Sequence, residues 1–341
     1  ALRRELGAVT TVETPTPRKM TVIYSRADKV FRGIVTAGAL TSLVALGIIA
    51  GFLILRSSGT FREFGFNFLT GTEWFSAGED PLGGATAAAD EANDGSIFSI
   101  GPMIVGSVVV ASIALLFAVP LSIGGALYIE FFAPRFIYRP LVILLDLAAA
   151  IPSLIFGLWG VEIFTSFGVR WATFLNDRLG FIPIFSVEFE NFGRSPFVAG
   201  CVLAALVVPI TTSVAREVYS RTPRDLIDTC YALGGTKLGA IRSVVLPYGK
   251  SGVFAGIMLG LGRALGETVA IYLMLNLVFK YSFNILDSTG GNVASMIALK
   301  FGEASDKEIS ALMASGLVLF VITLIVNTIA SSIIQRTTPR A

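Results

Sequence analysis

Long runs of residues without charged side chains recur along this chain of 341 residues. A hydrocarbon core about 30 Å thick is crossed by about 20 helical residues, so an uncharged apolar run of that length is typical of a membrane span. The whole sequence is 54% hydrophobic and only 15% charged, which excludes an ordinary soluble domain. The sequence therefore predicts an all-α integral membrane protein.

Six runs are predicted to cross the membrane as helices: residues 33–55, 95–129, 139–160, 195–215, 251–279 and 309–335. The second is too long for one straight crossing, and Pro120 predicts a kink or a helix end within it. The first 32 residues are polar and basic and lack the apolar stretch of a signal peptide. We therefore expect the first span to anchor the chain.

Lysine and arginine are unevenly distributed between the segments that join these spans. With the N-terminus inside, the cytoplasmic segments hold 17 of the 26 basic residues and the outer loops hold eight. Because basic residues resist translocation, both termini are predicted to be cytoplasmic. The first outer loop, residues 56–94, is acidic, and we interpret it as a hydrated loop rather than an ion site.

The composition also limits the chemistry of the chain. The absence of histidine removes the commonest general base and metal ligand, which argues against an intramembrane hydrolase. Cys201 and Cys230 cannot form a metal site alone, and the predicted topology makes a disulfide between them improbable. A net charge of +2 with dispersed basic residues gives no indication of nucleic-acid binding.

The second outer segment, residues 161–194, mixes seven phenylalanines and Trp171 with charged residues. Aromatic and polar residues together favour the level of the lipid headgroups. This pattern predicts an interfacial helix or a half-buried turn, and a docking surface for an extracytoplasmic partner remains the alternative.

The cytoplasmic loop 216–250 has a composition unlike that of a flexible loop. A short helix is predicted from Pro223 until Gly234 and Gly235 stop it. A second short amphipathic helix is predicted to follow and to end at Pro247. Two short helices in this position would form a rigid surface for a soluble partner.

This loop resembles the cytoplasmic EAA loop of ABC-importer permeases. Asp228, Thr229 and Cys230 stand where that family has Glu-Ala-Ala, Gly234 stands on its glycine, and Val244, Leu246 and Pro247 stand on its closing I-x-L-P pattern. The resemblance implies a coupling helix that docks on an ATPase subunit. Gly249 to Ser251 also read "GKS", but the glycine that a Walker loop needs five residues earlier is absent, so no ATP site is expected here.

Three stretches are similar to PstC-type permease subunits of phosphate importers: "VVLPYGKSGVFAGIMLGLGRALGETVAIYL", "DLAAAIPSLIFGLWG" and "SALMASGLVLFVITLIVNTIA". The resemblance extends over about residues 96–335. It implies a type I ABC-importer permease of MetI-like architecture in a prokaryotic cytoplasmic membrane. The implied partners are a homologous PstA-type permease, two ABC ATPase subunits that bind ATP, an extracytoplasmic phosphate-binding protein and membrane lipid. No catalytic residue and no cofactor are expected in this chain.

This interpretation divides the chain into four parts: a cytoplasmic tail over residues 1–32, the first span and acidic outer loop over 33–95, a permease core over 96–335 that contains the coupling loop 216–250, and a cytoplasmic tail over 336–341. Two alternatives stay open. The substrate could be another oxyanion, sulfate or molybdate, and a secondary transporter or anion channel could use the same charges without ATP.

Arg263 and Glu267 lie in the fifth predicted span, where isolated charges are costly. Residues four apart share one helical face, so the two side chains are predicted to pair. A guanidinium offers a fork of donors that fits two phosphate oxygens, which favours a substrate pathway over a purely structural ion pair. Asp146, in the third span, is a further candidate for the pathway or for packing.

Gly252, Gly256 and Gly260 precede this pair at four-residue spacing. Small residues repeated at this interval let the backbones of two membrane helices approach each other closely. The spacing therefore predicts that the fifth span packs tightly against a neighbouring helix.

Overall fold

The computed structural model describes residues 25–76, 95–187 and 191–337, without the side chains of 333–337. The chain divides into two compact units, Ala1–Gly51 and Phe52–Ala341, with the boundary inside the first helix. The described part of the first unit is helical, and its side chains are largely exposed. The second unit contains every other element.

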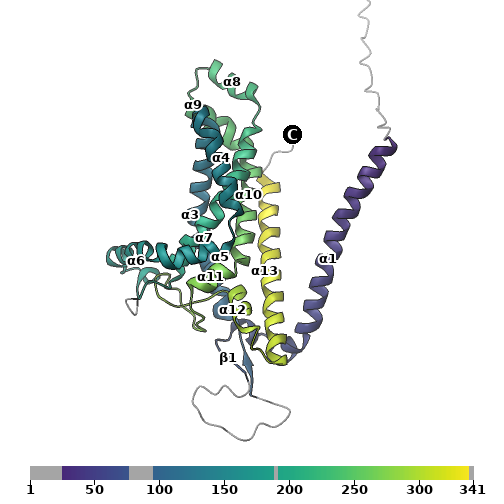
Figure 1. Ribbon diagram of the computed structural model, residues 1–341, viewed down its shortest axis with the longest axis vertical. Helices are drawn as coiled ribbons and strands as arrows, with labels where there is room; N and C mark the ends of the chain where they lie inside the picture. Colours follow the sequence, from purple (N-terminus) through teal and green to yellow (C-terminus); the bar gives the residue numbers. More distant parts are fainter. Residues whose placement is uncertain (1–24, 77–94, 188–190, 338–341) are drawn as a thin grey trace, which may run out of the picture. The chain divides into compact units, whose positions relative to one another are not determined.

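The helices, in chain order, are α1 Arg26–Phe64, α2 Asn67–Thr70, α3 Gly101–Leu127, α4 Arg135–Ala150, α5 Ser153–Trp159, α6 Thr165–Leu179, α7 Pro196–Ser220, α8 Arg224–Ala232, α9 Lys237–Ala240, α10 Leu246–Gly266, α11 Val269–Met274, α12 Val293–Lys300 and α13 Asp306–Thr337 (Figure 1). Short π-helical turns occupy Tyr128–Phe132, Gly160–Phe164 and Ile241–Val245, and a 3₁₀ turn occupies Pro183–Phe185. Two short strands, β1 Trp74–Phe75 and β2 Ile97–Phe98, pair antiparallel.

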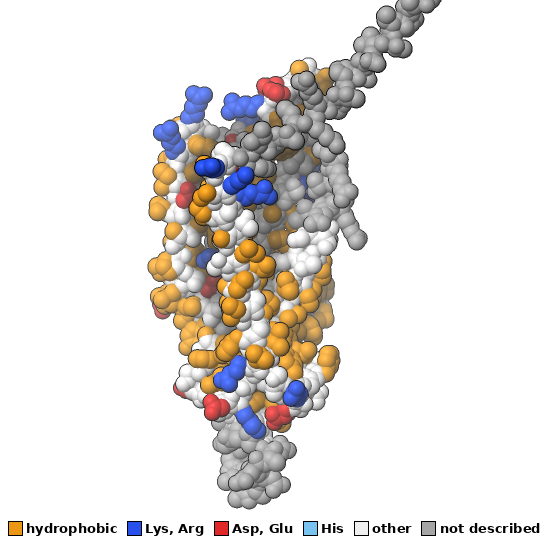
Figure 2. All heavy atoms as spheres, turned by 90° about the vertical axis from the view of Figure 1, so that its right-hand side faces the viewer, with side chains coloured by type: hydrophobic (Ala, Val, Ile, Leu, Met, Phe, Trp, Pro, Cys, Tyr) orange, Lys and Arg blue, Asp and Glu red, His pale blue; other side chains and the backbone are white. Residues whose placement is uncertain are grey.

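In the part of the chain that the structure describes, five helical segments are long and apolar enough to cross a membrane: Arg26–Phe64, Gly101–Phe132, Pro196–Ser220, Lys237–Gly266 and Asp306–Ser332. A sixth crossing exists if the bent pair Arg135–Ala150 and Ser153–Leu179 is counted as one span. Figure 2 shows one face of the molecule, where hydrophobic side chains dominate the middle and charged side chains gather mainly towards the two ends. The prediction of a helical membrane protein is therefore confirmed, and its six spans agree with the count that takes the bent pair as one span.

Helix α7 lies at the centre of the second unit and packs against α3, α4 and α10. Its inner residues belong to the largest apolar cluster, where Val198, Leu203 and Val207 are almost completely buried. The glycines of α10 make the contact with α7 close. A Cβ atom on Gly256 would lie 2.8 Å from a methyl carbon of Val214, so the predicted tight packing is found between α10 and α7.

The third predicted span is not one helix. Helix α4 ends at Ala150, Ile151 and Pro152 adopt extended conformations, and the following helical segment turns by 95°. The residue before a proline avoids the helical region, and this restriction accounts for the break. The span predicted over residues 139–160 is therefore broken at Ile151 and Pro152 and is not one continuous helix.

Helix α3 behaves in the opposite way at its own proline. Pro120 lies inside the helix, which continues to Leu127 and then into a π-helical turn. The residues before Gly101 are not helical, because β2 occupies Ile97–Phe98. The predicted run over residues 95–129 therefore includes a short strand before the helix, and the helical segment Gly101–Phe132 alone has 32 residues. Of the kink or helix end expected at Pro120, the helix end is absent.

The fifth predicted span is also interrupted. Helix α10 ends at Gly266, Glu267 is extended, and α11 begins at Val269 and covers only six residues. The chain then runs without regular structure until α12. The prediction of one continuous helix over residues 251–279 was wrong.

The last and first spans are close to their predicted positions but longer. Helix α13 spans Asp306–Thr337, compared with the predicted 309–335. Helix α1 begins at Arg26, inside the predicted tail. The centre of the acidic outer loop and the residues after 337 lie outside the described part of the chain.

Candidate functional site

Arg263 lies in the last turn of α10, where a positive charge complements the negative end of the helix dipole. Its side chain is half-buried, and its Nε atom is buried without a hydrogen-bond partner. The residue lines an open groove with a volume of about 710 Å³. The lining comes from three helices: Ile210 of α7, Ala255, Met258, Leu259, Gly262 and Arg263 of α10, and Asn327 and Ser331 of α13.

This groove is mostly apolar, and Arg263 is the charged side chain among its lining residues. Asn327 and Ser331 add two polar side chains from the facing helix. A guanidinium with an unpartnered N–H in an apolar setting retains its full capacity to donate hydrogen bonds. The groove can therefore offer a fixed positive charge to an anion, with neutral polar groups opposite.

Glu267 lies just beyond the end of α10 and is 7% exposed. Its Oε1 atom accepts a hydrogen bond of 3.3 Å from the backbone N–H of Ala270, in the first turn of α11. Its backbone carbonyl accepts a 2.8 Å hydrogen bond from Nδ2 of Asn292. Asn292 in turn caps α12 in a reciprocal capping box with Ser295. Glu267 thus joins the starts of two short helices.

The predicted ion pair between Arg263 and Glu267 is not formed. Helical geometry ends at Gly266, so the two residues do not share one helical face. Among the described residues, no ion pair joins these two side chains, and the Glu267 carboxylate instead satisfies a backbone donor of α11. The four-residue spacing failed as a predictor because it presupposes a helix that continues through both positions.

Asp146 is exposed on α4, and its neighbours Ile143, Leu144 and Leu147 are exposed apolar residues. Within the described part of the chain, Asp146 has no hydrogen bond or ion pair. A role in packing within this chain therefore has no support from contacts, and its role in a pathway stays a prediction.

The loop over residues 216–250 contains the first predicted short helix. Helix α8 begins after Pro223, and its end is a Schellman motif: Gly235 N–H donates to the Cys230 carbonyl and Gly234 N–H donates to the Tyr231 carbonyl. Gly234 has a φ of +84°, a conformation that favours glycine. Asp228, Thr229 and Cys230 form the middle of α8, and Thr229 Oγ1 donates to the Asp225 carbonyl.

The second predicted short helix does not end at Pro247. Helix α9, a π-helical turn and α10 follow without a break, and Leu246 and Pro247 form the first turn of α10. Pro247 has no N–H and cannot donate a helical hydrogen bond. It stands in the first turn of α10, just after the π-helical turn, and a proline is tolerated in the first turn of a helix. The part of the loop from Lys237 onward is therefore helically continuous with the helix that carries Arg263, whereas α8 is joined to it through the non-helical residues 233–236.

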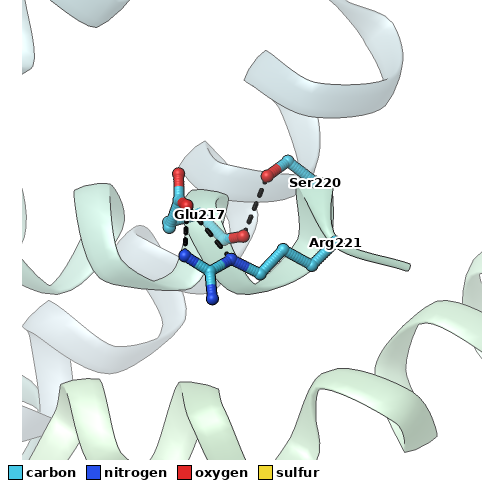
Figure 3. A network of polar contacts seen from close by, with 3 residues as sticks. All are labelled: Glu217, Ser220 and Arg221. Carbon is cyan, nitrogen blue, oxygen red and sulfur yellow. Dashed lines mark hydrogen bonds and ion pairs between the residues drawn. The ribbon is translucent and has the colours of Figure 1, made fainter. Parts of the chain in front are cut away.

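Three further contacts lie at the end of α7 and at the start of α9, on either side of α8. At the end of α7, Arg221 forms a 2.8 Å ion pair with Glu217, while Ser220 donates to the Glu217 carbonyl (Figure 3). This pair is exposed, so it contributes little to stability. The Lys237 ammonium lies 4.6 Å from the centre of the Phe132 ring, which ties α9 to the end of the α3 segment.

A buried polar network lies at the end of the second unit opposite α8, and the sequence did not predict it (Figure 1). Glu308, at the start of α13, accepts hydrogen bonds from Trp74 Nε1 at 2.6 Å and Ser76 Oγ at 2.8 Å. Lys300 lies 3.4 Å from the same carboxylate. Trp74 and Ser76 are more than 200 residues from Glu308 in the sequence, so no local pattern could have indicated their part of the network. Together they fix the strand pair against α12 and α13.

In the described residues, no group of three or more His, Cys, Asp or Glu side chains could hold a metal ion. Cys201 lies in α7 and Cys230 in α8, and both are free thiols.

Residues 118–341 match the family model described as binding-protein-dependent transport system inner membrane component. The chain belongs to this family. It is 36% identical over 327 residues to "Phosphate transport system permease protein PstC" of Xylella fastidiosa (strain 9a5c), with 95% of each chain covered. It is 37% identical over 302 residues to the protein of that name in Haemophilus influenzae (strain ATCC 51907 / DSM 11121 / KW20 / Rd), with 88% of this chain and 90% of the relative covered.

A solved structure, "Inward facing conformations of the MetNI methionine ABC transporter: CY5 SeMet soak crystal form", covers 70% of this chain and 94% of its own, at 14% identity and a TM-score of 0.46. The family assignment confirms the expected permease class, a membrane component of a multi-subunit transport system. The resemblance to PstC-type permeases is likewise confirmed by relatives that match along nearly the whole chain.

Proposed function

We propose that this chain is the membrane permease subunit of an ATP-driven importer of inorganic phosphate, and that Arg263 contacts the phosphate during passage. The observation that carries the proposal is the half-buried guanidinium of Arg263, with an unpartnered Nε, in an open groove between α7, α10 and α13. The names of the relatives support phosphate as the substrate. An arginine stays protonated at every physiological pH and matches two phosphate oxygens at once.

The groove is open along one side, so this chain forms only part of a closed path. We infer that a homologous PstA-type permease covers it, that two ABC ATPase subunits bind ATP and grip the α8 loop, and that an extracytoplasmic phosphate-binding protein delivers the substrate. Leu226, Tyr231 and Leu233 of the α8 segment are exposed large hydrophobic residues, which is expected of a docking surface. In this proposal both termini lie in the cytoplasm, as the excess of basic residues in the predicted cytoplasmic segments favours.

In this mechanism, the partner ATPases move α8 and α9. Because α9 continues into α10 without a break, the motion of α9 would reach Arg263 along the continuous helical segment Lys237–Gly266. The path then opens alternately to each side of the membrane. Glu267 acts mainly by fixing the start of α11 beside the end of α10.

The test replaces Arg263 by Gln and by Lys in the complex of this chain, the second permease and the two ATPase subunits. The complex is reconstituted in liposomes and supplied with phosphate-loaded binding protein. Uptake of radiolabelled phosphate, normalised to assembled complex, should be lost with Gln and partly retained with Lys, because Lys keeps the charge but not the planar fork. Arg62→Gln is the matched control, since Arg62 is exposed in the last turn of α1. Normal uptake by Arg263→Gln would refute the role of Arg263.

The same vesicles separate the remaining alternatives. Excess unlabelled sulfate or molybdate should leave phosphate uptake unchanged, whereas strong competition would favour another oxyanion. Omission of ATP should abolish uptake. Uptake that continues without ATP would favour a secondary transporter or channel.

A further inference from the structure

Helix α6 carries an exposed stripe of aromatic and basic side chains. Phe167, Trp171 and Phe174 are 54%, 67% and 59% exposed, and their spacing places them on one face of the helix. Arg170 and Arg178 extend the same face and are also exposed. We call these five residues the α6 stripe.

The arginines of the α6 stripe lie near its rings. The guanidinium carbon of Arg170 is 6.0 Å from the Phe167 ring centre, and that of Arg178 is 5.7 Å from the Phe174 ring centre. Such cation–π contacts limit the movement of the guanidinium groups. The result is two positive charges held beside an apolar surface.

The opposite face of α6 is already occupied. Ala172 is completely buried, and a Cβ on Gly168 would lie 3.0 Å from the methyl groups of Val198 in α7. This contact fixes the rotation of α6, so the α6 stripe faces away from the helix bundle. Exposure of the stripe is therefore a consequence of the packing and not of a loose helix.

The direction of α6 indicates what it faces. The segment Ser153–Leu179 is bent by 95° from α4, and α6 extends sideways from the bundle, across the direction of α3 and α13 (Figure 1). A helix perpendicular to spanning helices lies along the membrane plane. Aromatic rings and arginines together on such a helix are suited to the boundary between acyl chains and headgroups.

We propose that the α6 stripe binds phospholipids at the outer face of the membrane, with its rings among the upper acyl chains and its two arginines on headgroup phosphates. Guanidinium and phosphate are complementary in charge and in donor geometry. The exposed Asp177 reduces the net charge of this face but leaves it positive. The proposal is independent of which substrate the permease transports.

The first test uses tryptophan fluorescence of the complex in vesicles whose lipids carry bromine at defined acyl positions, because bromine quenches only nearby indoles. Trp171→Phe should remove most of the quenchable signal, and quenching should be stronger with shallow than with deep bromines. Trp159→Phe is the control, since Trp159 is less exposed and lies outside the α6 stripe. Equal quenching with and without Trp171, as a covering protein subunit would cause, would overturn the proposal.

The second test counts phospholipids that stay bound to the purified complex in native mass spectrometry. The double variant Arg170→Gln, Arg178→Gln should retain fewer phospholipids than the wild type. Asp177→Asn, a neighbour on the same helix, should lose none. Unchanged lipid retention in the double variant would remove the arginines from lipid binding.

Discussion

The close packing of α10 on α7 predicts that Gly256→Ala destabilises the protein although alanine is the better helix former. The new Cβ would lie 2.8 Å from Cγ1 and 3.1 Å from Cβ of Val214, whereas carbon atoms prefer about 3.5–4.0 Å. Rotation of the valine can move Cγ1 but not Cβ. Helix α10 must therefore shift away from α7.

Overpacking of this kind costs about 1–3 kcal/mol. Alanine also gains about 1 kcal/mol of helix propensity relative to glycine, so the variant needs a control with the same gain. Gly124→Ala provides it, because a Cβ on Gly124 in α3 meets nothing within 4 Å. The propensity gain cancels in the comparison, and the steric cost remains.

The assay is thermal unfolding of the purified complex. A difference of about 1–3 kcal/mol corresponds to a Tm about 2–12 °C lower for Gly256→Ala than for Gly124→Ala, at roughly 2–4 °C per kcal/mol. If the two variants unfold at the same temperature, the α7–α10 contact does not depend on a bare glycine, and the reasoning fails.

Three other perturbations test the rest of the structure. Gly234→Ala should reduce co-purification of the ATPase, because a side chain at positive φ costs about 1–2 kcal/mol and disturbs the end of α8. Gly239→Ala is the control, since Gly239 has ordinary backbone geometry, and equal ATPase recovery with the two variants would contradict the prediction. Trp74→Phe removes the hydrogen bond to the buried Glu308 carboxylate and should lower stability by about 1–3 kcal/mol, measured as a lower Tm. Asn292→Ala removes the α12 cap and the hydrogen bond to the Glu267 carbonyl, so Tm should fall by the equivalent of about 0.5–2 kcal/mol. An unchanged Tm would show that the break between α10 and α11 does not depend on Asn292.

The spans were predictable from sequence because hydropathy reports a property of consecutive residues. The first helix of the loop over residues 216–250 was predictable for a similar reason: a proline start and a Gly234 end act locally. The glycines of α10 were also informative, since their spacing requires only that the segment around them be helical. Each successful prediction depended on residues that are near one another in the chain.

The breaks within spans had weaker signals. At Pro152 the signal was present, because the residue before proline avoids helix, but an apolar run obscured it. At Glu267 no local residue dictates the end of α10. The freed backbone is satisfied by the Glu267 carboxylate and by Asn292, which lies 25 residues later. A helix break at membrane depth is tolerated only with such partners, and a distant partner cannot be read from local sequence.

The break changes the interpretation of Arg263. On a continuous helix, Glu267 would neutralise the guanidinium and weaken its hold on an anion. In the observed arrangement, Glu267 is bonded to α11, and Arg263 lies in the last turn of α10, where the exposed ends of the backbone dipoles are negative. An anion at Arg263 would therefore meet the positive guanidinium and, close by, the negative end of the α10 helix dipole. A transport site must bind firmly enough to accept its substrate and weakly enough to release it. In the role proposed for Arg263, the C-terminus of α10 would supply the weakening effect without an ion pair.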